Sequence, residues 1–154
     1  MNELNELLSA EEGGWSSLDE ADLVPRLGAL YAAAAFFAFV LVDDFDAKDE
    51  LVEFPLLFRL FLPLALGGLA PLVAAGRVLA RWSYVDSRLA EDVLYFEETG
   101  WADGFMAKKT EDVINRDQQA RTAEVAPRLS WQRRVVSTIA AATASLFVVA
   151  VVAP

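Results

Sequence analysis

The stretch VVSTIAAATASLFVVAVVAP, residues Val135–Pro154, decides the fold class of this chain. It contains no charged residue, and its length matches the roughly 20 apolar residues that a helix needs to cross the hydrocarbon core of a bilayer. We therefore predict a membrane-spanning helix over residues 135–154.

A second apolar stretch, residues 27–42, reads LGALYAAAAFFAFVLV. It is short for a span, but Leu23, Val24 and Arg26 can lengthen it at its N-terminal side, because a long basic side chain can place its apolar stem along the membrane and its charge in the interface. We predict a second spanning helix here.

A third apolar stretch, residues 60–76, reads LFLPLALGGLAPLVAAG and lies between Arg59 and Arg77. Its prolines and its Gly67–Gly68 pair would break a helix in water. Membrane helices tolerate such residues where neighbouring helices satisfy the freed backbone groups. The glycine pair is best explained by close helix packing, for which Ser137, Ala141 and Ser145 offer small side chains.

The composition agrees with a membrane protein. The 154 residues suit one domain, and 55% of them are hydrophobic, more than the roughly 45–50% of soluble domains. A net charge of −10 argues against nucleic acid as a partner. The sequence contains no cysteine and no histidine, which removes disulfides, the usual zinc sites and histidine acid–base chemistry.

The basic residues orient the predicted helices. Of 13 basic residues, only Lys48 and Arg59 belong to the connection between the first two spans, which is otherwise acidic. Lysine and arginine collect on the side that is not translocated. We expect the N-terminus and residues 82–134 on the cytoplasmic or stromal side and the C-terminus on the opposite side. The opening MNELNELLSAEEGG has neither the basic region nor the apolar core of a signal peptide.

Four segments follow from these patterns. Residues 1–26 form an acidic N-terminal segment with an interfacial helix, which the capping-box spacing of Ser17 and Glu20 begins. Residues 27–81 form a transmembrane helical hairpin, residues 82–134 an amphipathic helical segment, and residues 135–154 the last span.

The amphipathic segment 82–134 has two predicted helices. Val85, Leu89, Val93 and Phe96 recur at helical spacing and continue the second span out of the membrane, up to Gly100. A second helix begins at the cap signal Thr110, carries the i,i+4 pairs Asp112–Arg116 and Asp117–Arg121, and ends at Pro127.

The densest polar and aromatic cluster covers residues 95–104, YFEETGWADG. Its carboxylates Glu97, Glu98 and Asp103 suggest a metal or acid–base site. Adjacent glutamates cannot share one helix face, however, and no Glu-x-x-His motif completes a di-metal site. A turn or docking surface explains the cluster better, because two glycines allow unusual backbone angles and Trp101 can anchor an interface. We assign no catalytic residue and no metal ligand.

The second half of the chain resembles a known family. The runs RWSYVDSRLAEDVLYFEETGWADG, INRDQQARTAEVAPRL and WQRR resemble a chloroplast and cyanobacterial membrane-protein family described as conserved in the green lineage and diatoms. The matching residues are Tyr84, Arg88, Leu89, Glu97, Glu98, Gly100, Trp101, Asp103, Gly104, Arg116 and Asp117. The sequence departs from the family where Phe96 separates Tyr95 from the glutamates and where Thr99 replaces a serine.

The resemblance implies a setting in the thylakoid membrane of the chloroplast and brings no established active site. Together with the predicted spans and the distribution of basic residues, it leads us to expect a multi-pass protein with a stromal N-terminus and a lumenal C-terminus. We expect a non-catalytic accessory subunit of photosystem I that helps to bridge the core subunits and the light-harvesting antenna. The alternatives are a transient assembly or stress-protection factor and a membrane enzyme. The expected docking residues are Tyr95, Glu97, Glu98, Gly100, Trp101, Asp103, Gly104, Arg116 and Asp117.

Lipid is an expected partner, and chlorophyll and carotenoid could bind at the helix surface. Without histidine, chlorophyll magnesium would need a carboxylate, an amide or a backbone ligand, and Glu97 and Glu98 are the candidates.

Overall fold

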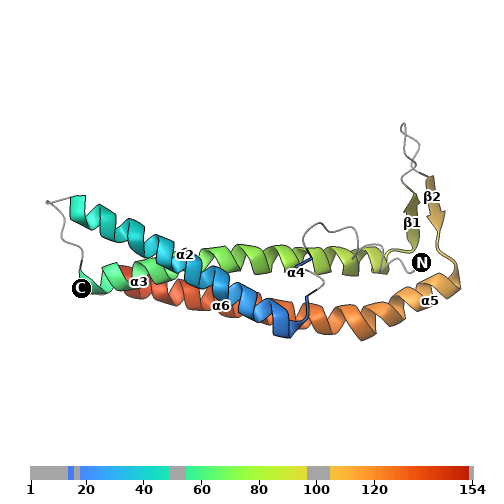
Figure 1. The fold of residues 1–154 in the computed structure, drawn as a ribbon. Coiled ribbons are helices and arrows are strands. Elements are labelled where there is room, and N and C mark those ends of the chain that lie inside the picture. The colour runs from blue at the N-terminus through green and yellow to red at the C-terminus, as the bar shows by residue number, and fades with distance from the viewer. Residues whose placement is uncertain (1–13, 16–17, 49–54, 97–104, 153–154) are drawn as a thin grey trace.

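The computed structural model describes residues 14–15, 18–48, 55–96 and 105–152. Its elements are α2 (Glu20–Lys48), α3 (Leu56–Gly67), α4 (Leu69–Ala90), β1 (Val93–Phe96), β2 (Phe105–Lys108), α5 (Glu111–Ala120), the π-helical turn η1 (Arg121–Val125) and α6 (Ala126–Val152). Three continuous helical stretches run side by side along the molecule (Figure 1). The predicted helical membrane-protein class is therefore confirmed.

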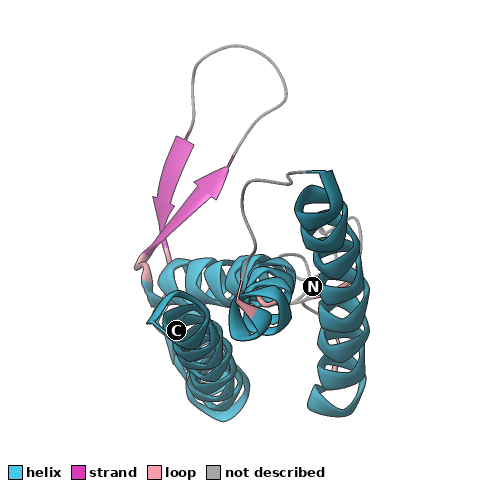
Figure 2. Cartoon of the chain, turned by 90° about the vertical axis from the view of Figure 1, so that its left-hand side faces the viewer, coloured by secondary structure: helices cyan, strands magenta, loops and turns pink. Residues whose placement is uncertain are grey.

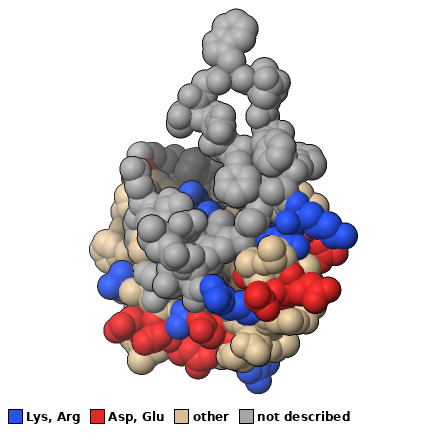
Figure 3. Space-filling model, turned by 90° about the vertical axis from the view of Figure 1, so that its right-hand side faces the viewer, with Lys and Arg blue, Asp and Glu red and all other residues tan. Residues whose placement is uncertain are grey.

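Three helical stretches are long and apolar enough to cross a membrane: Glu20–Asp44, Leu56–Ala90 and Glu111–Val152. They contain the apolar stretches 27–42 and 60–76 of the sequence, and the stretch 135–154 as far as Val152. Charged side chains gather at the opposite end of the molecule from the C-terminus (Figure 3). We call this end, formed by the second half of α4, the β-strands, α5, η1 and the start of α6, the polar end.

The second span is interrupted at its glycine pair, between the end of α3 at Gly67 and the start of α4 at Leu69. Gly68 keeps helical angles, φ −66° and ψ −20°, and its N–H donates to the carbonyls of Leu64 and Ala65. Pro71 has no N–H to offer the carbonyl of Gly67, four residues earlier, so the hydrogen-bond ladder is interrupted there. The interruption separates α3 from α4 without ending the span.

The glycine pair brings all three spans together. A Cβ atom on Gly67 would lie 2.6 Å from the Cβ of Ala35 in α2, and one on Gly68 would lie 3.2 Å from the Cβ of Thr143 in α6 and still closer to its hydroxyl. Close packing is therefore the role of the pair, as the sequence indicated. The residue of α6 that packs against the pair differs from the prediction. It is Thr143, whereas the predicted Ser137, Ala141 and Ser145 are exposed.

Several predicted element boundaries are wrong. The first helix is not a separate interfacial helix, because α2 runs from Glu20 through Pro25 into the span. The helix that was predicted to end at Pro127 also continues through this residue into α6. The N–H of Ala126 donates to the carbonyl of Arg121, one residue further back than in an α-helix, and this π turn absorbs the break that a proline causes.

The largest error concerns Val93 and Phe96. They were expected on a helix continuing to Gly100, but α4 ends at Ala90 and these residues form β1, which pairs antiparallel with β2. The register places Val93 opposite Lys108 and Phe96 opposite Phe105. Figure 2 shows this hairpin projecting from the helices.

Candidate docking site at the polar end

The polar end has a buried core of its own. Val78, Trp82, Val85 and Leu89 recur on one face of α4 and pack against Val125 and Leu129. All six side chains are buried, so the helical spacing of Val85 and Leu89 was interpreted correctly. This core holds α4, the helix that precedes the hairpin, against η1 and α6.

A buried ion pair fixes the base of the hairpin. The ammonium of Lys109, directly after β2, donates to a carboxylate oxygen of Asp117 at 2.7 Å and to the backbone carbonyl of Arg88 at 3.3 Å. Both residues of the pair are buried, Lys109 at 5% exposure and Asp117 at 6%. The lysine charge also lies at the C-terminal end of α4, where the helix dipole favours a cation.

A second ion pair joins α4 to the π turn. The guanidinium of Arg121 donates to both carboxylate oxygens of Asp86, at 2.5 and 3.1 Å. This hydrogen bonding lowers the pKa of Asp86, partial burial opposes the shift, and the positive charges of Arg121 and Arg133 add to it. The same contacts raise the pKa of Arg121. The predicted pair Asp117–Arg121 is therefore not formed, because each residue has a different partner.

Arg128 connects the start of α2 to this end. Its guanidinium lies 5.1 Å from the centre of the Trp82 ring, within the range of a cation–π interaction, and 3.5 Å from the carboxylate of Asp19. Lys109, Asp86 and Arg128 were not singled out from the sequence, and Arg121 was paired there with a different aspartate. Their partners are up to 109 residues away, and no local spacing reveals such pairs.

The predicted docking residues fall into three groups. Glu97, Glu98, Gly100, Trp101, Asp103 and Gly104 lie outside the described residues, as do the magnesium-ligand candidates among them. Tyr95 lies on β1, and Arg116 is exposed on α5. Asp117 faces the interior and binds Lys109, so its carboxylate holds the chain together and is not on the surface. The structure thus brings Asp117 to the base of the hairpin on which Tyr95 lies.

The hairpin itself has little support. Within the described part of the chain, β1 and β2 pair only with each other, and no helix packs extensively against either strand. A two-stranded hairpin alone is marginally stable in water. Among the described residues there is no group of three or more carboxylates that could hold a metal ion. The arrangement is therefore that of a protruding arm fixed at its base.

A family model, CGLD27-like, described as conserved in the green lineage and diatoms 27, matches residues 1–152. The chain is 31% identical over 153 residues to a chloroplastic Arabidopsis thaliana protein named for the same conservation, which covers 97% of this chain and 46% of the relative. It is 26% identical over 144 residues to the uncharacterized protein ycf36 of Porphyra purpurea, with 93% of this chain and 84% of the relative covered. The chain thus spans about half the length of the Arabidopsis protein. No solved structure matches it.

Proposed function

The chain belongs to the CGLD27-like family, and on this premise we propose that it is a non-catalytic accessory subunit of a thylakoid photosynthetic complex. The complex is photosystem I, and the subunit helps to bridge its core and the peripheral light-harvesting antenna. The chloroplastic relative and the three membrane-spanning stretches support a chloroplast membrane setting.

The protruding hairpin is the observation that carries a docking role. Its base is fixed by Lys109 and Asp117, while its strands have no neighbouring layer in the described chain. Two paired strands have two outer edges, and an unpaired edge can add a strand from another protein. A partner that covers the hairpin would supply the packing that two strands lack alone.

The membrane surface of the protein leaves room for neighbours. Phe36, Phe37 and Phe39 on α2 are exposed, and only 6% of the most apolar part of α6 is buried inside the chain. Such surfaces contact lipid, partner helices or pigments. In the proposed orientation the polar end, which carries most arginines, faces the stroma, and the C-terminus faces the lumen.

Purification of photosystem particles after mild solubilisation tests the proposal. The variant replaces residues 97–104 by Asn-Gly, whose tight turn suits two strands that already pair at Phe96 and Phe105. We expect the variant to reach the membrane in normal amounts but to be lost from the particles. The matched control substitutes alanine for Glu111 and Asp112, which are exposed on α5 beside the arm, and should copurify like the natural chain.

Stoichiometry separates a permanent subunit from an assembly or stress factor. A subunit is recovered at a constant ratio to the photosystem core, whereas an assembly factor is enriched in immature particles and leaves them on maturation. Recovery of the natural chain away from both kinds of particle would refute the proposal. Pigment analysis of the same particles, with and without the chain, tests chlorophyll and carotenoid binding.

A further inference from the structure

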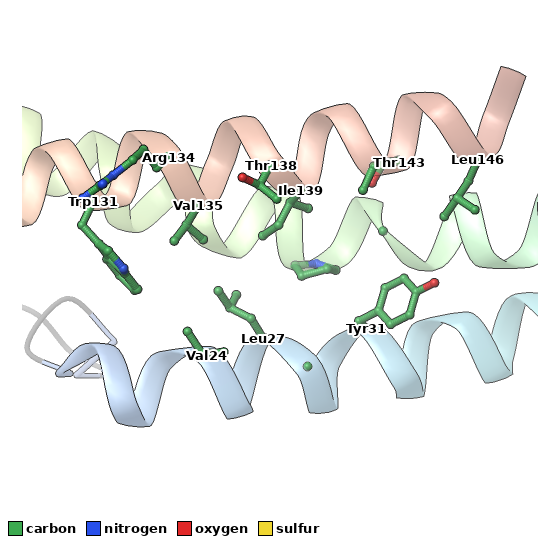
Figure 4. A pocket seen from close by; sticks show the side chains of 14 residues that line it. Val24, Leu27, Tyr31, Trp131, Arg134, Val135, Thr138, Ile139, Thr143 and Leu146 are labelled. Atoms are coloured by element: carbon green, nitrogen blue, oxygen red, sulfur yellow. The ribbon is translucent and has the colours of Figure 1, made fainter.

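An apolar groove of about 680 Å³ runs between α2 and α6 (Figure 4). Leu27, Gly28 and Tyr31 form its wall on α2, and Gly68 and Pro71 form its floor. The wall on α6 extends from Trp131 and Arg134 near the polar end to Leu146 within the span. At 1.5 Å per residue, the groove follows α6 for roughly 18 Å beyond Arg134.

The groove exists because α2 and α6 pack on α3 and α4 and not extensively on each other. Ala35 and Thr143 contact consecutive glycines, which directs the two helices to neighbouring faces of the same span. Gly28 adds width, since a Cβ atom there would meet nothing within 4 Å. Trp131 packs beside Leu23 and Leu27 and narrows the groove where it meets the polar end of the molecule.

The volume of the groove suits a small molecule and not another helix. Ligand sites commonly measure about 300–1,000 Å³. A spanning helix about 30 Å long and 10 Å wide would need more than roughly 2,000 Å³. A narrow, elongated apolar space within a membrane suits an acyl chain.

The charge at its mouth indicates the kind of amphiphile. Arg134 is exposed, and the described residues offer it no carboxylate partner. Trp131 lies next to it on the groove, at the level where aromatic and basic residues meet headgroups. A guanidinium at this position favours an anionic headgroup over a zwitterionic one.

We propose that this groove binds one anionic glycerolipid, with its headgroup on Arg134 and one acyl chain between α2 and α6. The bound acyl chain fills the space between two helices that do not pack extensively on each other. The lipid thereby completes the packing of the membrane-spanning part. This site is independent of the hairpin and of the partner proposed for it.

The test uses the full chain, delipidated in detergent and titrated with phosphatidylglycerol or phosphatidylcholine of the same acyl chains, with bound lipid counted by native mass spectrometry. We expect one phosphatidylglycerol per chain, bound about fivefold more tightly than phosphatidylcholine. Arg134→Gln should remove this preference, whereas Arg133→Gln, at the neighbouring exposed arginine that does not line the groove, should keep it.

Glycine variants test the position of the acyl chain. Gly28→Leu should fill the groove and abolish binding of both lipids. Gly76→Leu is the matched control, because a Cβ atom there also meets nothing within 4 Å but the residue does not line the groove. Equal binding of the two lipids by the natural chain, or unchanged binding in Gly28→Leu, would overturn the proposal. The proposal would also be overturned if the natural chain held a pigment or a second copy of the chain in the groove, and if Gly28→Leu displaced that occupant and not lipid.

Discussion

Lys109 and Asp117 show how much one buried pair contributes to the polar end. Removing one charge of a buried pair leaves the other without compensation, at a cost of about 3–5 kcal/mol. We expect Lys109→Met to destabilise the chain in nanodiscs by this amount, measured from melting curves followed by tryptophan fluorescence. The double variant Lys109→Met with Asp117→Leu should recover much of the loss, because neither charge then remains buried.

Lys108→Met is the control for this pair. Lys108 is the neighbouring lysine, but its side chain is exposed, so its removal should change stability by less than about 0.5 kcal/mol. Equal melting temperatures for the Lys108 and Lys109 variants would contradict the structural role of the buried lysine.

Asp86 gives the polar end a defined pH dependence. Its pKa is lowered by the hydrogen bonds from Arg121, so the folded chain holds the charged form more strongly than the unfolded chain does. The resulting stability is complete above the ordinary aspartate pKa of about 3.9 and is lost as pH falls through the lower folded value. The exposure of Arg121 keeps this contribution within about 1 kcal/mol.

The comparison of Asp86→Asn with Glu124→Gln measures that contribution. Both variants remove one carboxylate near the π turn, but Glu124 is exposed and has no ion pair among the described residues. Between pH 6 and pH 3, the melting temperature of Asp86→Asn should fall less than that of the natural chain. The Glu124 variant should follow the natural chain throughout, and a flattened curve for it alone would exclude Asp86 as the source.

The interaction partners of individual residues were the feature of this molecule that the sequence predicted least well. Asp117 was selected through its family motif, yet its role comes from Lys109, which nothing in the local pattern distinguishes from Lys108. The pairs of Asp86 and Arg128 depend on how the π turn η1, α4 and the start of α2 pack together. Such contacts follow from tertiary structure and not from spacing along one helix.

At the scale of elements, Gly67 and Gly68 control the meeting point of the spans. Gly67→Ala and Gly68→Ala should each destabilise the chain by about 1–3 kcal/mol, as expected for overpacking. Gly28→Ala and Gly76→Ala should have little effect, because both positions face open space. Thermal melting in nanodiscs measures all four.

A second substitution in the facing helix distinguishes the cause of the destabilisation at Gly67 from that at Gly68. The nearest obstacle at Gly68 is the hydroxyl of Thr143, so Thr143→Ala should relieve part of the loss in Gly68→Ala. A Cβ atom on Gly67 would also meet the backbone of Ala35, with the Cα atom 2.7 Å away. The substitution Ala35→Gly should therefore recover little of the stability lost in Gly67→Ala. Full rescue of the Gly67 variant by Ala35→Gly would show that the backbones are less close than described.

Helices were predicted more reliably than their ends. The three apolar stretches identify the spans because hydrocarbon demands continuous apolar length with internally satisfied backbone. The helix through Pro127 was missed because a π turn can absorb a proline. The strand at Val93–Phe96 was missed because apolar residues three or four apart in a short run do not separate helix from strand.

At the scale of the whole molecule, the orientation in the membrane is the consequence most open to direct measurement. The chain has no cysteine, so a single introduced cysteine reports its own position without background.

Ser87 is exposed at the polar end, and Asp44 is exposed at the other end of the first span. We expect a membrane-impermeant maleimide, added to intact thylakoids, to label Ser87→Cys at once and Asp44→Cys only after the membrane is opened, because the arginine-rich polar end stays on the side of synthesis. Detergent-solubilised protein, in which both cysteines should react, controls for access within the fold. Labelling of Asp44→Cys in intact membranes, with Ser87→Cys protected, would invert the topology and place the hairpin in the lumen, away from any stromal partner.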